Sequence, residues 1–134
     1  TVLGGSEEVS DRGRGVSRRW GGGMRQAGVL AACGLVALEE EVPRLAGDHE
    51  NAALLADGPR GIDALAVSPW SARTNMVFVT PGPEDHEPLR ASLGSNGILT
   101  GSQKPTMRLV PHRDVTRADV EKVVDAFHAF YRRR

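Results

Sequence analysis

Apolar and polar residues follow one another along this chain in a pattern that predicts helices first and short strands afterwards. The longest apolar stretch, Ala27 to Leu38, has the length of a buried core helix and lies in a helix predicted from about Met24 to Glu41. Pro43 either kinks this helix or starts a second one, because a residue before proline is disfavoured in the helical conformation. Ser6 is placed to cap an earlier helix that begins at Glu7.

The remainder of the chain alternates between helical and strand patterns. The predicted elements are a helix over about 44–56, strands over 63–67 and 74–79, a short helix over 87–93, strands over 97–100 and 107–110, and a last helix. The last helix starts at the capping-box pattern Thr116-Arg117-Ala118-Asp119 and is expected to turn inward Val120, Val123, Val124, Phe127 and Phe130. This order predicts an α/β fold, specifically an α+β small domain with helices packed on one face of a small, mainly antiparallel sheet.

Composition narrows the possible functions. The 134 residues suffice for one ordinary domain, and 17 basic residues balance 17 acidic ones, so we expect neither nucleic acid nor a membrane surface as a partner. The stretch 27–38 is too short to span a bilayer. Cys33 is the one cysteine, which excludes an internal disulfide and fits a reducing cytoplasm, and we expect it to be inert in the core. No histidine or cysteine has metal-ligand spacing, so no metal site is predicted.

The first residues look like the end of a domain that began earlier. Thr1-Val2-Leu3 is apolar and prone to form a strand, and Gly4-Gly5-Ser6 follows it. We therefore expect residues 1–23 to be a linker and helix that follow a separate large domain, and residues 24–134 to form a small C-terminal domain.

A glycine run, Gly21-Gly22-Gly23-Met24-Arg25-Gln26-Ala27-Gly28, opens the apolar segment. Glycines let the backbone approach a ligand closely, and the free N–H groups at a helix start attract anions. The run is therefore a candidate anion site with an arginine beside it. The alternative is a plain loop that precedes a core helix.

An ordered series of segments resembles the C-terminal part of the threonine aldolases. The series consists of the glycine run, Asp48-His49-Glu50-Asn51-Ala52, Thr74-Asn75-Met76-Val77-Phe78-Val79, Met107-Arg108-Leu109-Val110-Pro111-His112 and Asp114-Val115. Those enzymes belong to the beta-eliminating lyases and use pyridoxal 5'-phosphate in the fold type I architecture. The resemblance implies cleavage of a β-hydroxy amino acid, threonine or allo-threonine, to glycine and an aldehyde. It also implies a large cofactor-binding domain, a neighbouring subunit, and a homo-oligomer that is a dimer or a tetramer.

The resemblance implies roles for a few residues. Arg108 matches the arginine that holds the substrate carboxylate, a task suited to the two parallel donors of a guanidinium; the alternative is an exposed strand arginine. Arg25, with Gly22 and Gly23, matches the segment near the cofactor phosphate, commonly that of the neighbouring subunit; the alternative is an arginine on the surface. Arg18 and Arg19 lie where the family often has basic residues near the same phosphate, and a solvated face is at least an equal alternative.

The histidines are expected to have local roles. His49 packs or hydrogen-bonds on its helix, His86 lies in an acidic loop, and His128 lies on the final helix. His112 next to Asp114 resembles a base and its orienting carboxylate, but its place before the last helix favours a local cap interaction.

No catalytic residue is expected in this chain. The family's cofactor-attached lysine lies just upstream of the segment that resembles residues 1–6, and neither Lys104 nor Lys122 matches it. We therefore predict that the isolated chain does not cleave threonine. Pro111 stands where the family usually has threonine and removes an N–H from a strand end, which leaves the geometry after Arg108 open. Two other functions remain: an interaction module that has lost catalysis, and part of another lyase of the same fold type.

Overall fold

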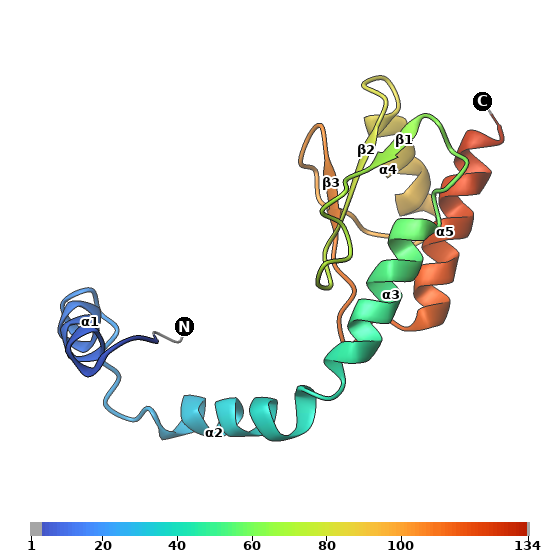
Figure 1. The fold of residues 1–134 in the computed structure, drawn as a ribbon. Coiled ribbons are helices and arrows are strands. Elements are labelled where there is room, and N and C mark those ends of the chain that lie inside the picture. The colour runs from blue at the N-terminus through green and yellow to red at the C-terminus, as the bar shows by residue number, and fades with distance from the viewer. Residues whose placement is uncertain (1–3, 134) are drawn as a thin grey trace. The chain divides into compact units, whose positions relative to one another are not determined.

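The computed structural model describes residues 4–133, which contain five α-helices, one π-helical segment and three strands (Figure 1). In chain order these are α1 (Glu7–Arg19), α2 (Gly28–Val36), η1 (Ala37–Glu41, π-helical), α3 (Leu45–Asp57), β1 (Leu65–Val67), β2 (Val77–Pro81), α4 (His86–Ser95), β3 (Met107–Leu109) and α5 (Arg117–Tyr131).

The chain divides into two compact units, residues 1–42 and residues 43–134, and each is described by itself. The strand-like segment expected at residues 1–3 lies outside the described residues. The boundary expected between residues 23 and 24 concerns the domains of a complete enzyme, and it stays a prediction.

Residues 43–134 form a three-stranded antiparallel sheet in the order β1-β2-β3, with helices on one face (Figure 1). Burial alternates along the strands: Val77, Val79 and Met107 are buried beneath the helices, whereas Phe78 and Arg108 face the other way. Helices α3 and α4 contact β2, and both also pack against α5. The predicted fold class, helices on one face of a small antiparallel sheet, is confirmed.

The core of this unit draws on each of its elements. Its buried apolar residues are Ala52, Leu55, Leu65, Val77, Val79, Leu89, Leu93, Met107, Val120 and Phe127. Helix α5 contributes as predicted, because Val120 and Phe127 are buried and the other apolar residues of its inner face pack against the core. Gly58 lies so close to α5 that a Cβ there would come within 2.2 Å of Val124 Cγ2, which explains a glycine at the end of α3.

Both predicted helix caps are present. Ser6 Oγ accepts a hydrogen bond from the Val9 N–H at 3.4 Å. At the start of α5, Thr116 Oγ1 accepts from the Asp119 N–H at 3.2 Å, and the Asp119 carboxylate accepts from the Thr116 N–H at 2.9 Å. Hydrogen bonds from the Thr116 hydroxyl, and then from its N–H, hold the pKa of Asp119 below its ordinary value, because they favour the charged form.

The strand predicted over residues 97–100 is wrong. Helix α4 ends with Gly97 in the left-handed region at φ 75°, and the Ile98 N–H donates to the Leu93 carbonyl at 2.9 Å. This is the Schellman type of helix ending, in which the chain reverses sharply after the last turn. The Ile98 N–H is thereby used to close the helix instead of beginning a ladder, and residues 97–106 form a loop before β3.

Helix α2, in the unit of residues 1–42, differs from its prediction. It begins at Gly28 instead of Met24, and its end passes into the π-helical η1 before the turn at Pro43. The expectation that it is buried is wrong, because Val29 is 72% exposed and Cys33 is exposed as well. The pattern identified the helix but not its packing partner, since α2 is apolar around its whole circumference and has no single inward face. Among residues 4–133, no helix combines the length and apolar character of a membrane span.

Candidate functional site

Arg108 lies in the middle of β3, opposite Phe78 of β2, and is exposed on the sheet face away from the helices. Phe78 directs its backbone groups away from β3, because its carbonyl accepts from the Ser68 N–H at 3.0 Å and its N–H donates to Ser71 Oγ at 2.9 Å. Phe78 and Arg108 are therefore a non-hydrogen-bonded pair, the kind in which opposed side chains come closest. Within the described residues, the Arg108 guanidinium has no hydrogen bond or ion pair, so it is available to an anion.

Arg108 also lines an open pocket of about 790 Å³. The loop after α4 forms one wall, where Thr100 Oγ1 is buried without a hydrogen-bonding partner in the described structure. The start of α5 and the turn before it contribute Lys122, Asp114 and Asp119. The lining of this pocket therefore carries both signs of charge.

The loop that walls this pocket is fastened to the start of α4. His86, which is 3% exposed, donates from Nε2 to the Gln103 carbonyl at 2.9 Å. Lys104 Nζ lies 2.9 Å from Glu87 Oε1, and Arg90 lies 3.1 Å from the other oxygen of that carboxylate. Hydrogen bonds from Lys104 and then from Arg90 hold the pKa of Glu87 below its ordinary value. The expectation that His86 lies in a loop is wrong, because it is the first residue of α4.

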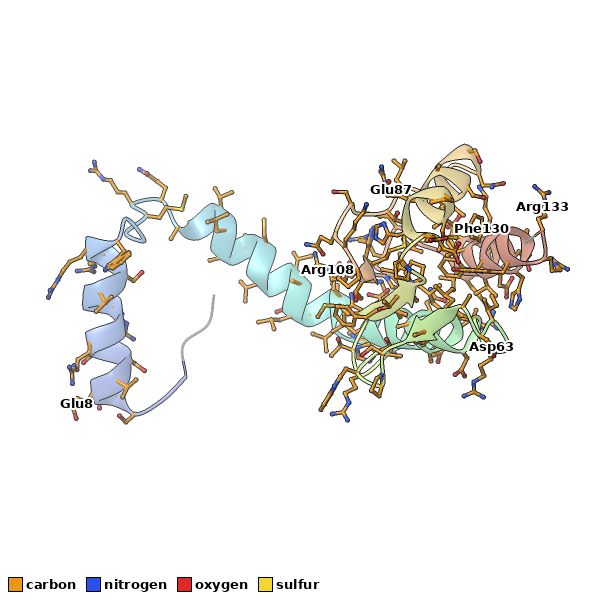
Figure 2. All side chains as sticks on the ribbon, turned by 90° about the horizontal axis from the view of Figure 1, so that it is seen from above. Glu8, Asp63, Glu87, Arg108, Phe130 and Arg133 are labelled. Atoms are coloured by element: carbon orange, nitrogen blue, oxygen red, sulfur yellow. The ribbon has the colours of Figure 1, made fainter. Side chains whose placement is uncertain are left out.

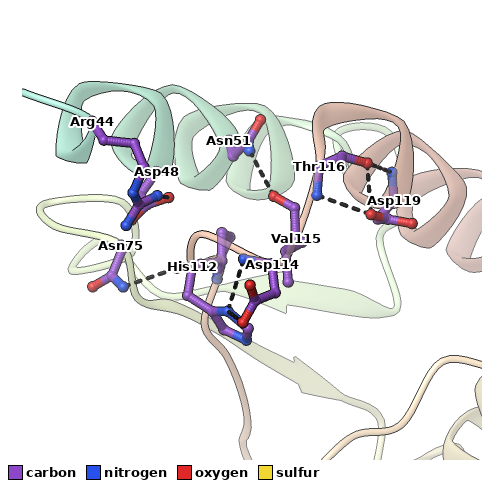
Figure 3. A network of polar contacts seen from close by, with 10 residues as sticks. Arg44, Asp48, Asn51, Asn75, His112, Asp114, Val115, Thr116 and Asp119 are labelled. Carbon is purple, nitrogen blue, oxygen red and sulfur yellow. Dashed lines mark hydrogen bonds and ion pairs between the residues drawn. The ribbon is translucent and has the colours of Figure 1, made fainter. Parts of the chain in front are cut away.

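Two asparagine side chains fasten the segment that follows Arg108 (Figure 3). Asn75 Nδ2 donates to the Pro111 carbonyl at 2.9 Å, and Asn51 Nδ2 donates to the Val115 carbonyl at 3.3 Å. The first contact comes from the residues before β2 and the second from α3. The chain between β3 and α5 is therefore held at both ends by elements that also build the core.

Two of the three remaining histidines have local partners, whereas no hydrogen bond or ion pair of the His49 side chain is seen among the described residues. His112 Nδ1 accepts from the Asp114 N–H at 3.3 Å, which is the local interaction predicted in place of a catalytic pair. His128 Nε2 donates to the Gly58 carbonyl at 2.8 Å and joins α5 to the end of α3. His49 is exposed on α3. Nowhere in residues 4–133 do three His, Cys, Asp or Glu side chains gather as a metal site requires.

The glycine run belongs to the unit of residues 1–42, whereas β3 belongs to the unit of residues 43–134. Gly22 is explained by internal packing: a Cβ there would lie 2.2 Å from Ser17 Oγ, and its N–H donates to the Ser17 carbonyl at 2.8 Å. Gly22 and Gly23 line an open groove of about 890 Å³ together with Arg18. Arg25 lies in the turn before α2, exposed and without a side-chain partner among the described residues. Arg25 does not line this groove, and the Gly22 N–H is already used within the turn.

Figure 2 shows that Arg108 is well separated from Asp63, Phe130 and Arg133, which belong to the same unit.

Comparison with known proteins decides the family, because the family model of the beta-eliminating lyases matches residues 1–81. The chain belongs to the beta-eliminating lyase family.

Curated proteins that are similar to this chain are named low-specificity L-threonine aldolases. Low-specificity L-threonine aldolase 1 of Arabidopsis thaliana is 37% identical over 131 residues, which are 95% of this chain and 37% of that protein. Low specificity L-threonine aldolase of Escherichia coli (strain K12) is 40% identical over 121 residues, which are 86% of this chain and 34% of that protein. The chain thus spans about a third of the length of the curated relatives it matches.

Sequence reasoning on this beta-eliminating lyase chain missed the structural roles of three residues. Asn51 and Asn75 stand in segments singled out for their resemblance, yet neither was assigned a contact. Asp48, only 4% exposed, accepts a hydrogen bond from Arg44 at 2.8 Å at the start of α3. The signal that was present for Asn75 is its place before a strand whose partner strand is followed by a proline, Pro111.

Proposed function

We propose that this chain is the C-terminal part of a pyridoxal-phosphate-dependent threonine aldolase that cleaves a β-hydroxy amino acid to glycine and an aldehyde. The proposal rests above all on one observation: similarity to a low-specificity L-threonine aldolase extends over 95% of the chain at 37% identity. The free guanidinium of Arg108 beside a pocket with both signs of charge supports an amino acid as the ligand.

In this proposal Arg108 binds the α-carboxylate of the substrate. A guanidinium donates two parallel hydrogen bonds to a carboxylate and keeps its charge at any physiological pH, so it fixes the orientation of the carboxylate as well as its position. Fixing that group limits rotation about the bonds of Cα, which is how a positioning contact raises the rate of a cleavage. The cofactor would supply the electron sink for the broken Cα–Cβ bond.

Arg25 is proposed as a ligand of the cofactor phosphate, with Gly22 and Gly23 shaping the turn that presents it. Its exposed guanidinium and the neighbouring groove support this role. The contact of Gly22 with Ser17 supports a shaping role for this glycine, because its N–H is occupied within the turn. We propose that the phosphate is that of a neighbouring subunit.

The complete enzyme is proposed to include a large cofactor-binding domain, which carries the cofactor-attached lysine, and to be a cytoplasmic homo-oligomer. The exposed apolar side chains of α2 and η1 support a covering partner, since Val29 and Leu30 of α2 and Leu38 of η1 are each well over half exposed. A large domain packed there would bury them.

The test is to express the longest open reading frame that contains this chain and, in parallel, the 134-residue chain alone. We expect the longer protein to show the visible absorbance of bound pyridoxal phosphate and to release glycine and acetaldehyde from threonine, and the chain alone to do neither. Turnover by the chain alone would contradict the proposed division of the site. Cofactor binding with cleavage of a different amino acid would point to another lyase of the same fold type.

A further inference from the structure

The contact between Asn75 and Pro111 lies where the β2–β3 ladder would make its next pair of hydrogen bonds. Val77 opposes Leu109 in the register of the sheet, and the same register carried two residues further brings Asn75 opposite Pro111. Hydrogen-bonded and non-hydrogen-bonded pairs alternate along an antiparallel ladder. Because Phe78 is a non-hydrogen-bonded position, the position of Asn75 is a hydrogen-bonded one.

Pro111 cannot complete that pair, since proline has no N–H to donate. Its carbonyl belongs to a buried residue and accepts instead from Asn75 Nδ2 at 2.9 Å. Figure 3 shows this side chain reaching across to the segment between β3 and α5. The side-chain amide therefore takes the place of a ladder contact at the end of the strand that carries Arg108.

We infer that Asn75 is a positioning residue for Arg108, which fixes the guanidinium by holding the C-terminal end of β3 in register. This inference rests on the proposed function, in which Arg108 binds the carboxylate of an amino acid. Strand β3 is an edge strand of three residues, Met107–Leu109, so few other ladder contacts hold it. Loss of the Asn75 contact frees the strand end three residues beyond Arg108.

The test uses the complete enzyme and compares Asn75→Ala and the isosteric Asn75→Asp, which lacks the Nδ2 donor. We expect either variant to raise the KM for threonine about tenfold, since a displaced binding group costs this much or more, while the affinity for pyridoxal phosphate stays unchanged. Hydrogen exchange of peptides covering residues 107–115 is expected to speed up, which reports the strand without depending on activity. Asn75→Asp keeps the side-chain volume, so it covers the case in which the alanine variant does not fold.

A rescue experiment separates positioning from general stability. Pro111→Ala restores an N–H that can donate to the carbonyl of residue 75, so the double variant Asn75→Ala with Pro111→Ala is expected to reverse most of the rise in KM. The matched control is Asn96→Ala, because Asn96 Nδ2 also donates to a backbone carbonyl, that of Ser92 at 2.8 Å, at the end of α4. This control is expected to leave the KM unchanged.

Two outcomes would overturn the inference. One is an unchanged KM in both Asn75 variants although Arg108→Lys raises it, which leaves the proposed function intact. The other is a lower melting temperature with unchanged KM, which assigns Asn75 to stability alone. If Arg108→Lys itself has no effect on the KM, the proposed role of Arg108 has failed, independently of Asn75.

Discussion

At the scale of residues, Arg108 differs from several other arginines of its unit in having no side-chain partner among the described residues. Arg60, Arg90 and Arg117 each pair with a carboxylate three or four residues away, at 2.9–3.1 Å. Exposed pairs of this kind add little to stability, but they occupy the guanidinium. Strand alternation alone does not decide whether the Arg108 side chain is simply exposed or binds a ligand. Its free donors beside a pocket are what the structure adds.

Replacing Arg108 with lysine tests this difference in the complete enzyme. Lysine keeps the charge but loses the second parallel donor, so we expect the KM for threonine to rise about ten- to a hundredfold, the value of one charge-assisted hydrogen bond. The matched control is Arg60→Lys, whose side chain is exposed and pairs with Asp57 at the end of α3. Steady-state kinetics of the two variants decide the matter, and equal KM values would remove Arg108 from the carboxylate site.

At the scale of elements, the sequence predicts a helix or strand correctly where no other contact overrides the local signal. The capping box at Thr116 and the apolar face of α5 identify that helix correctly, because both signals act within one turn of the chain. Residues 97–100 have strand character, but the helix ending at Gly97 uses the Ile98 N–H first. The Asn75 contact joins residues 36 apart in sequence, so no local pattern reports it.

The same capping box predicts a pH dependence of stability. The pKa of Asp119 is lowered in the folded state, so its carboxylate stabilises the fold above the unfolded pKa of about 3.9 and ceases to do so as the pH falls through the lower folded value. We expect wild type to exceed Asp119→Asn in urea midpoint at pH 7, and the difference to shrink below about pH 4. Urea titrations of the chain at a series of pH values measure this. A difference that persists unchanged to pH 2 would exclude the carboxylate charge as its source.

At the scale of the whole molecule, apolar side chains are distributed differently in the two units. Residues 43–134 bury a core of aliphatic and aromatic side chains, whereas no described residue of α1, α2 or η1 is buried. A fully buried leucine or valine contributes about 1.5–3 kcal/mol, so leaving α2 exposed forgoes several such contributions. The sequence predicts that α2 is a buried helix, and the proposed large domain would supply the apolar surface that buries it.

Cys33 on α2 reports whether α2 is covered in the complete enzyme. The thiol is exposed in this chain, so we expect a thiol reagent to modify it in the 134-residue chain at least about tenfold faster than in the complete enzyme. Peptide mass spectrometry of the Cys33 peptide measures both rates, and unfolding the complete enzyme in urea should make them equal. Equal modification rates in the two folded proteins would show that nothing covers α2.

In the chain alone we also expect self-association through α2. Leu30→Lys should reduce this self-association, because a charge placed in an apolar contact opposes burial of that contact. A chain that stays monomeric at high concentration would count against α2 as a surface for self-association.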